Sequence, residues 1–255
     1  MNKMAEVRNL YFSYGQEPVL KDINLGINRG DFIVFIGPNG SGKSTLLKLM
    51  IGELKPDRGQ IQLLGKELNT LREWHRIGYM SQQIRNFNKS FPATVKEVVA
   101  AALYKEMGLI KVLNKRLEKR VDEVLELVGM EDFRDRQIGR LSGGQQQKVF
   151  IARTLVTKPE LIFLDEPLVG IDLNSQEELI KLLNRLNQDL NITIIMVAHE
   201  LQLIREAQQI AYFNGGEVFL YSQEDFASIG YLNKDILKAE TGPEIQYSNG
   251  GDYNA

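Results

Sequence analysis

The sequence predicts an α/β fold with a mostly parallel sheet, an antiparallel β portion beside it and an inserted α-helical subdomain. Three observations support this fold class. The short runs that begin at Phe32, Leu161 and Ile192 are apolar at nearly every position, as expected for strands covered on both faces. Helical patterns follow the first two runs, which favours parallel strands joined by helices. The segment from Thr94 to about Met130 is rich in helix formers and shows no strand pattern.

The antiparallel portion is predicted from the amino-terminal part of the chain. The opening segments, which include the run VRNLYF from Val7, alternate more between apolar and polar residues and carry the turn signals YGQEP and NRGD. Alternation of this kind is typical of antiparallel strands that expose one face to solvent. We expect this portion to pack beside the parallel core.

The 255 residues, of which 43% are hydrophobic, fit one compound domain better than several independent ones. We expect a single domain over residues 1–220, with its helical subdomain at about residues 90–158, and a carboxyl-terminal extension over residues 221–255. The end of the extension is polar and contains glycine, so we expect its last ten or so residues to be mobile.

Composition excludes several function classes. A formal net charge of −2 gives no overall attraction to nucleic acid, and without cysteines the chain has no disulfides or thiolate metal sites. The two histidines cannot form a metal site by themselves. No signal peptide is recognisable, and no stretch approaches the roughly 18–20 apolar residues that span a bilayer. We therefore expect a soluble cytoplasmic protein that does not bind nucleic acid.

A phosphate-binding loop follows the strand predicted at Phe32. It consists of Gly37, Pro38, Asn39, Gly40, Ser41, Gly42, Lys43, Ser44 and Thr45. The glycines allow backbone N–H groups to surround phosphates, and the start of the following helix adds positive potential. Lys43 would neutralise phosphate oxygens and the Ser44 hydroxyl would ligate Mg²⁺. The motif predicts a P-loop NTPase core that binds ATP and Mg²⁺.

The strand predicted at Leu161 ends in two acids, Asp165 and Glu166. This position puts both carboxylates at the carboxyl edge of the sheet, where α/β proteins bind their ligands. Asp165 can hold Mg²⁺, and Glu166 can orient and polarise an attacking water molecule. Taken alone, such acids would more often be surface or capping residues, but the phosphate loop favours the catalytic interpretation.

A third motif precedes a helical pattern upstream of the two acids and consists of Leu141, Ser142, Gly143, Gly144 and Gln145. With this motif the chain resembles the ATP-binding cassette (ABC) family, whose signature is LSGGQ, from Val7 to about Leu220. The resemblance implies the ABC ATPase fold and a head-to-tail homodimer in which the signature contacts ATP bound by the other subunit. An exposed Ser-Gly-Gly segment at a helix start suits such an anion contact.

The resemblance also assigns roles to single residues. Tyr14 in FSYG matches the aromatic residue that stacks on adenine, although an ordinary strand residue is the alternative. Gln82 matches the glutamine that touches Mg²⁺ and the attacking water, and its neighbour Gln83 leaves the register open. His199 matches the histidine that contacts the γ-phosphate. Asp172 ends a segment that matches the loop crossing the dimer interface.

The class of cassette protein is inferred from further likenesses. A single cassette without a spanning segment resembles the ATPase subunit of a transporter whose membrane permease is a separate chain, and implies a location on the inner face of the cell membrane. The segment FNKSFPATVKEVVAAALY resembles the ATPases of zinc and manganese importers served by metal-binding lipoproteins, with zinc favoured. Another importer or exporter, or a non-transport cassette in a soluble or nucleic-acid-linked assembly, is the alternative. We expect Trp74 and His75 to be ordinary packing and surface residues.

Overall fold

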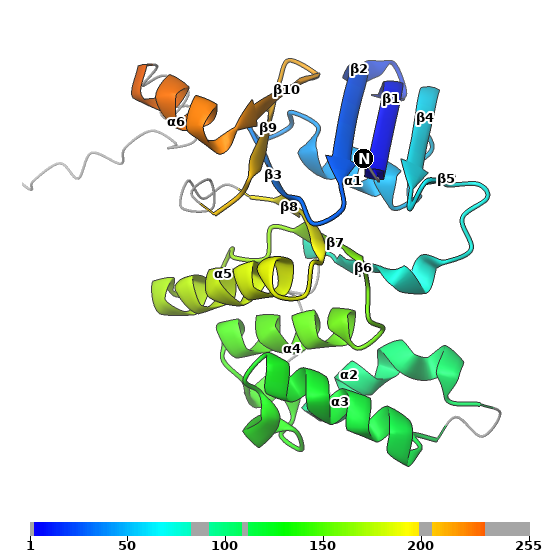
Figure 1. The fold of residues 1–255 in the computed structure, drawn as a ribbon, viewed down its shortest axis with the longest axis vertical. Helices are drawn as coiled ribbons and strands as arrows, with labels where there is room; N and C mark the ends of the chain where they lie inside the picture. The colour runs from blue at the N-terminus through cyan, green and yellow to red at the C-terminus, as the bar shows by residue number, and fades with distance from the viewer. Residues whose placement is uncertain (1–2, 83–91, 109–111, 199–205, 233–255) are drawn as a thin grey trace, which may run out of the picture.

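The computed structural model describes residues 3–82, 92–108, 112–198 and 206–232 (Figure 1). The larger sheet of this part contains β3 (Phe32–Ile36), β6 (Ile77–Met80), β7 (Leu161–Asp165), β8 (Thr193–Val197), β9 (Gln209–Asn214) and β10 (Glu217–Ser222). Their order is β10-β9-β3-β8-β7-β6. Neighbours from β9 to β6 are parallel, and β10 is antiparallel at one edge. The prediction of a mostly parallel sheet is confirmed.

A smaller antiparallel sheet contains β1 (Lys3–Tyr14), β2 (Glu17–Asn28), β4 (Arg58–Leu63) and β5 (Lys66–Glu67). The strand order is β2-β1-β4-β5, and all three pairings are antiparallel. Buried and exposed residues alternate along parts of β1 and β2, because one face of this sheet packs on the core. The predicted antiparallel portion is therefore present.

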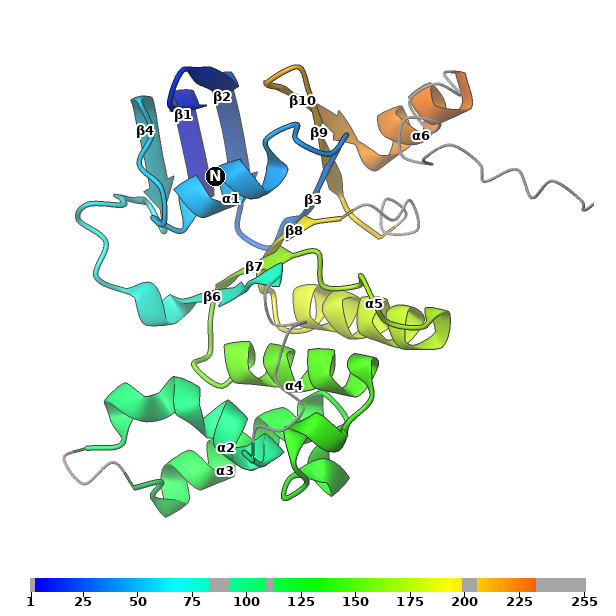
Figure 2. The ribbon, with the colours of Figure 1, turned by 180° about the vertical axis from the view of Figure 1, so that it is seen from behind.

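Both faces of the larger sheet are covered, and for this reason every residue of β3, β7 and β8 is buried. One face packs against helix α1 (Lys43–Met50) and the antiparallel sheet, through side chains such as Phe35, Phe163 and Leu46. Figure 2 shows α1 beneath the strands of the smaller sheet. This layer holds the phosphate loop between the two sheets.

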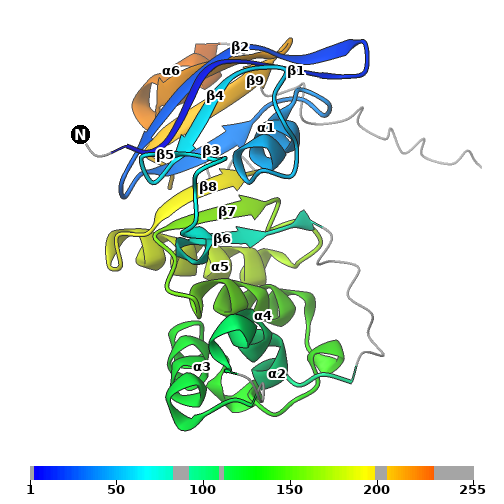
Figure 3. The same ribbon diagram turned by 90° about the vertical axis from the view of Figure 1, so that its right-hand side faces the viewer.

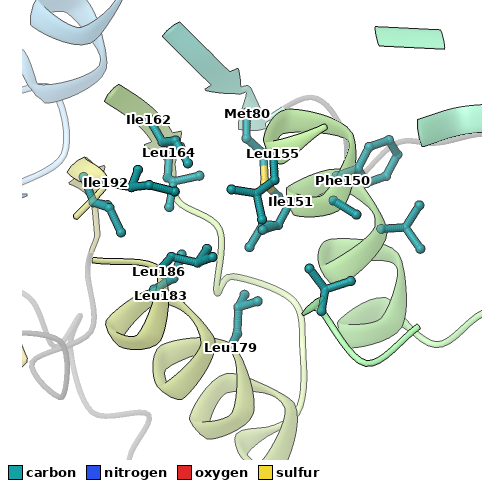
Figure 4. Packing of buried hydrophobic residues seen from close by; sticks show 14 of the residues in the cluster. Met80, Phe150, Ile151, Leu155, Ile162, Leu164, Leu179, Leu183, Leu186 and Ile192 are labelled. Atoms are coloured by element: carbon teal, nitrogen blue, oxygen red, sulfur yellow. The ribbon is translucent and has the colours of Figure 1, made fainter. Parts of the chain in front are cut away.

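The opposite face of the larger sheet packs against α4 (Gly143–Leu155) and α5 (Leu173–Gln188). Figure 4 shows Ile151 and Leu155 of α4 and Leu183 of α5 pointing toward Leu164 on β7. Helices α1 and α4 therefore cover opposite faces of the same sheet, so the segments that begin these two helices are separated by it.

Two further helices extend the layer around α4, namely α2 (Val95–Ala100) and α3 (Lys115–Leu127). Buried side chains such as Val99, Val121 and Phe150 join α2, α3 and α4 in one cluster. Thr94 and Glu97 form a capping box at the start of α2, and the Asn114 side chain caps α3. The predicted limits of the helical subdomain at residues 90 and 158 remain a prediction.

The carboxyl-terminal part of the described chain forms α6 (Gln223–Leu232), which follows β10 directly. Phe226 is buried against Tyr212 and Tyr221, so the predicted boundary at residue 220 falls within a packed hairpin and helix. The expected mobile end lies outside the described residues. Among the residues described, none of the helices combines the length and the apolar character that crossing a bilayer requires.

Candidate nucleotide-binding site

The phosphate loop connects β3 to α1 at the edge of the sheet where the parallel strands end (Figure 3). Gly37, Gly40 and Gly42 have φ angles of 140°, 79° and 102°, which residues with a side chain rarely adopt. A Cβ on Gly37 would lie 2.2 Å from the Phe213 carbonyl oxygen, and one on Gly42 would lie 2.6 Å from Leu20. Both sheets therefore pack directly on this loop.

Lys43 begins α1 and directs its ammonium group back into the loop. Its Nζ donates to the carbonyl oxygens of Gly37, at 2.6 Å, and Pro38, at 2.9 Å. The Ser41 hydroxyl is buried and has no hydrogen-bond partner among the described residues. A buried cation, an unsatisfied hydroxyl and the first N–H groups of a helix surround one short loop, and these groups suit phosphate oxygens. Asn39 and Gly40 are exposed at the tip of the loop.

The next residue of α1 reaches the end of β7. The Ser44 hydroxyl lies 3.0 Å from Oδ1 of Asp165 and donates to it, and Asp165 is only 4% exposed. A hydroxyl and a carboxylate are hard oxygen ligands of the kind Mg²⁺ prefers. The two residues predicted to hold the metal are thus in contact, and they fit it. Thr45 is half-buried on the same turn.

Glu166 follows directly, and Gln82 reaches it from the end of β6. Nε2 of Gln82 donates to Oε2 of Glu166 at 2.7 Å. Glu166 has a left-handed φ of 51°, a conformation that costs about 1–2 kcal/mol outside glycine. Its N–H donates to the Val197 carbonyl oxygen on β8 at 3.0 Å. The ends of three neighbouring strands therefore position this carboxylate beside the Ser44–Asp165 pair.

The segment Ser142–Gln145 opens α4 on the other face of the sheet. Ser142 is the N-cap, and its Oγ accepts from the Gln145 N–H at 3.3 Å while Gln145 Oε1 accepts from the Ser142 N–H at 3.0 Å. Ser142 and Gly143 are exposed, whereas Gly144 is buried. The structure does not bring this segment to the phosphate loop of its own chain, because the sheet lies between α1 and α4.

The remaining predicted residues lie at the periphery. Tyr14 ends β1 with half of its surface exposed, and its ring meets Phe12 edge-on. Asp172 caps α5, where its carboxylate accepts from the N–H of Ser175 at 3.0 Å and from its hydroxyl at 2.7 Å. These two hydrogen bonds lower the pKa of the Asp172 carboxyl. His199 and Gln83 lie outside the described residues.

Comparisons with known proteins agree with this arrangement. The family model described as ABC transporter matches residues 20–169. The chain belongs to the ABC transporter family. It is 48% identical over 201 residues to the zinc uptake system ATP-binding protein ZurA of Listeria innocua. The aligned region covers 79% of this chain and 78% of that protein. It is 40% identical over 206 residues to the manganese transport system ATP-binding protein MntB of Halalkalibacterium halodurans. This alignment covers 81% of this chain and 80% of that protein.

A solved structure resembles this ABC ATPase over most of its length. The ATP-binding cassette MJ0796, determined as a dimer in a post-hydrolysis state with ADP and Pi, is 30% identical with a TM-score of 0.73. The alignment covers 86% of this chain and 99% of that one. The described chain is thus an ATP-binding cassette ATPase, as the sequence motifs predicted.

One feature of this ABC ATPase escaped the sequence motifs. An open groove of about 1070 Å³ is lined on one side by Trp74 and His75, which precede β6, and on the other by residues after α2 and along α3, including Tyr104, Lys105 and Arg116. Trp74 is 38% exposed and Tyr104 57% exposed. A single aromatic residue before a strand carries no motif, so only the fold reveals this groove.

Proposed function

We propose that this chain is the ATPase subunit of an importer for a divalent metal ion, with zinc the first candidate and manganese the second. The observation that carries the cargo assignment is the 48% identity to a zinc uptake ATP-binding protein. The contact between Ser44 and Asp165 beside Glu166 supports an intact hydrolytic site. Cells of the source organism would then lose metal uptake when this site is disabled.

Different residues of the chain would bind different parts of the MgATP. The phosphate loop from Gly37 to Thr45 would surround the phosphates, and Lys43 would exchange its loop carbonyl partners for phosphate oxygens. Tyr14 would stack on the adenine. Ser44, Asp165 and Gln82 would hold Mg²⁺, which supplies charge neutralisation for the phosphate oxygens.

Hydrolysis needs a group that orients water and accepts its proton. Glu166 fits this role because its carboxylate is fixed by the hydrogen bond from Gln82 and by the backbone contact with β8. His199 follows β8 in the sequence and would contact the γ-phosphate. The contacts of Glu166 with Gln82 and of Ser44 with Asp165 support a base beside a metal-binding pair.

The completed site requires a second copy of the chain. Ser142, Gly143, Gly144 and Gln145 would contact the γ-phosphate bound by the partner, and Asp172 would lie at the interface. The separation of α1 and α4 by the sheet supports this head-to-tail homodimer, since one chain cannot join its own two motifs. The dimeric form of the related cassette MJ0796 supports it as well.

The groove beside Trp74 would receive the membrane permease. It lies between the segment that precedes β6 and the residues after α2 and along α3, and its rim carries Lys105, Arg116 and Lys119. A groove between the core and the helical layer suits a partner that moves one against the other. The protein would then lie on the inner face of the cell membrane, with a metal-binding lipoprotein as an indirect partner and no nucleic acid.

The proposal is tested by uptake of radioactive zinc and, separately, manganese in cells that lack the chromosomal copy of this protein. Cells would carry the wild type, Lys43→Ala or, as a control, Lys181→Ala at equal abundance, because Lys181 is exposed on α5. We expect Lys43→Ala to lose uptake of zinc and the control to retain it. Loss of manganese uptake alone would name manganese as the cargo.

Unchanged uptake of both metals in the Lys43→Ala cells would overturn the metal assignment. The proteins that co-purify with the chain then decide between the remaining classes. A polytopic membrane subunit indicates another importer or exporter, whereas a soluble complex or ATPase stimulation by nucleic acid indicates a non-transport cassette.

A further inference from the structure

Two glutamines occupy the same position in two different helices. Gln146 lies four residues after Ser142, the N-cap of α4, and Gln176 lies four residues after Asp172, the N-cap of α5. Nε2 of Gln146 lies 3.1 Å from the carbonyl oxygen of Ile138 and 3.4 Å from that of Leu141, and it donates to both.

Nε2 of Gln176 makes the corresponding contacts at 3.2 Å to the carbonyl oxygen of Leu168 and 3.4 Å to that of Ile171. In both cases the acceptors are the residues one and four positions before the N-cap. Each glutamine therefore ties the loop that leads into its helix back onto the first turn of that helix.

The starts of the two helices also contact each other. A Cβ on Gly144 would lie 2.4 Å from Ser175 Oγ, and a Cβ on Gly143 would lie 3.2 Å from Ile171. A cavity of about 90 Å³ between them is lined by Gly143, Gln146, Gln147, Phe150, Val169, Gly170 and Ile171. The signature segment (residues 141–145) and the interface loop (residues 169–172) thus form one packed unit at the starts of α4 and α5.

We propose that Gln146 and Gln176 are positioning residues that hold this unit in the conformation needed to close the ATP-bound dimer. The inference rests on the head-to-tail dimer of the proposed function. Neither glutamine needs to touch nucleotide, because each acts through the loop carbonyls it binds. Loops that are already ordered lose less conformational entropy on association, so fixing them strengthens dimer closure.

The role differs from general support of the fold. The signature segment and the interface loop face the second subunit in the proposed dimer, whereas the phosphate loop, on the other face of the sheet, binds nucleotide in the same chain. Loosening only the two loops should weaken dimer closure and leave nucleotide binding by the single chain unchanged. A purely structural role would lower the thermal stability and affect both measurements together.

The substitutions Gln146→Glu and Gln176→Glu keep side-chain shape and remove the amide donor. A negative charge in the first turn of a helix is favourable, which offsets part of the stability lost with the two hydrogen bonds. Gln188→Glu is the control, since Gln188 ends α5 and is exposed. All three are introduced into Glu166→Gln, which is expected to bind ATP without hydrolysing it, and Gln146→Lys and Gln176→Lys restore a donor.

Three quantities are measured for each variant: affinity of the monomer for a fluorescent ATP analogue, melting temperature, and the ATP-dependent dimer constant from analytical ultracentrifugation. We expect the dimer constant to weaken about tenfold in either Gln→Glu variant, because a loop that has lost its hydrogen bonds must be ordered again when the dimer closes. Monomer affinity should match the control, the melting temperature should fall by only a few degrees, and the Lys variants should recover most of the dimerisation.

The outcomes separate the two proposals. No ATP-dependent dimer in the Glu166→Gln parent would overturn the proposed dimer and this inference with it. A parent that dimerises, with Gln→Glu variants that dimerise equally well, would overturn only the positioning role. A loss of monomer affinity and melting temperature in parallel with dimerisation would also overturn it, because it indicates a structural role.

Discussion

At the scale of single residues, contacts within the protein fix the groups of the site. Glu166 has a left-handed backbone and is fixed from two sides, by the Gln82 side chain and by the Val197 carbonyl. Lys43 is already directed into the phosphate loop. Strained conformations persist where the surrounding structure over-determines them, and such positions cluster at active sites.

Replacing Glu166 with glutamine should leave ATP binding intact and slow hydrolysis by about 10²–10⁴-fold, the usual contribution of a general base. Phosphate release at saturating MgATP measures the effect. Glu177→Gln, an exposed change on α5, is the control and should retain full turnover. Turnover of Glu166→Gln within a few-fold of wild type would show that another group accepts the proton.

Tyr14→Ala should weaken ATP binding by about 1–3 kcal/mol, the usual range for stacking of a base on an aromatic ring, while Tyr14→Phe should bind nearly as well as wild type. Inorganic triphosphate carries no base and should bind all three proteins equally. Calorimetric titration with both ligands makes the comparison. Equal ATP affinity in wild type and Tyr14→Ala would mean that Tyr14 is an ordinary strand residue.

At the scale of secondary-structure elements, the close approach of α4 and α5 decides how the signature segment is presented. The φ angle of Gly144 is not positive, so the neighbouring Ser175, and not the backbone conformation, excludes a larger residue there. An added Cβ would lie 2.5 Å from Ser175 Cβ. A contact of this length forces the two helices apart.

Gly144→Ala should therefore destabilise the protein, since overpacking costs about 1–3 kcal/mol and exceeds the roughly 0.5–1 kcal/mol that alanine gains over glycine in a helix. Ser175→Gly removes the clashing atoms and should recover part of the loss in the double variant. Urea unfolding of the wild type, the two single variants and the double variant gives the coupling free energy between the two positions. Strictly additive effects would contradict the steric explanation.

At the scale of the whole molecule, one carboxylate joins three parts of the chain that are distant in sequence. Glu160, just before β7, pairs with Arg29 in the turn between β2 and β3 and with Arg76 just before β6. The hydrogen bonds from Arg76, and then from Arg29, hold the pKa of the Glu160 carboxyl at about 2, below its usual 4.5. The network connects the antiparallel sheet to the parallel core.

Because the folded protein lowers this pKa, the stabilisation by Glu160 is present above pH of about 4.5 and is lost as the pH falls toward 2. Wild type should therefore be more stable than Glu160→Gln at pH 7, and the difference should narrow below pH of about 4.5. Urea midpoints at several pH values measure this difference, with Glu177→Gln as the control. A difference that stays constant down to pH of about 3 would argue against the ion pairs.

Much of the site could be predicted because its motifs are local. The phosphate loop uses consecutive residues, and its glycines and Lys43 are recognisable in one stretch of sequence. The apolar patterns of the sequence did not identify β6, β9 and β10 as strands. For β9 and β10 a signal was available, because Gly215 and Gly216 separate two runs rich in β-branched and aromatic residues, as in a hairpin. Strand β6 has only four residues, too few for a clear period.

The sequence by itself determined the α/β class and predicted which residues bind phosphate, hold the metal and orient water, because these depend on residue type and on the order of strands and helices. Only the tertiary structure decided which groups meet. Ser44 touches Asp165 although 121 positions separate them, and Gln82 reaches Glu166 from another strand. The groove beside Trp74 and the packing of Gly144 on Ser175 likewise depend on how helices sit on the sheet, and that is set by side-chain packing between segments distant in sequence.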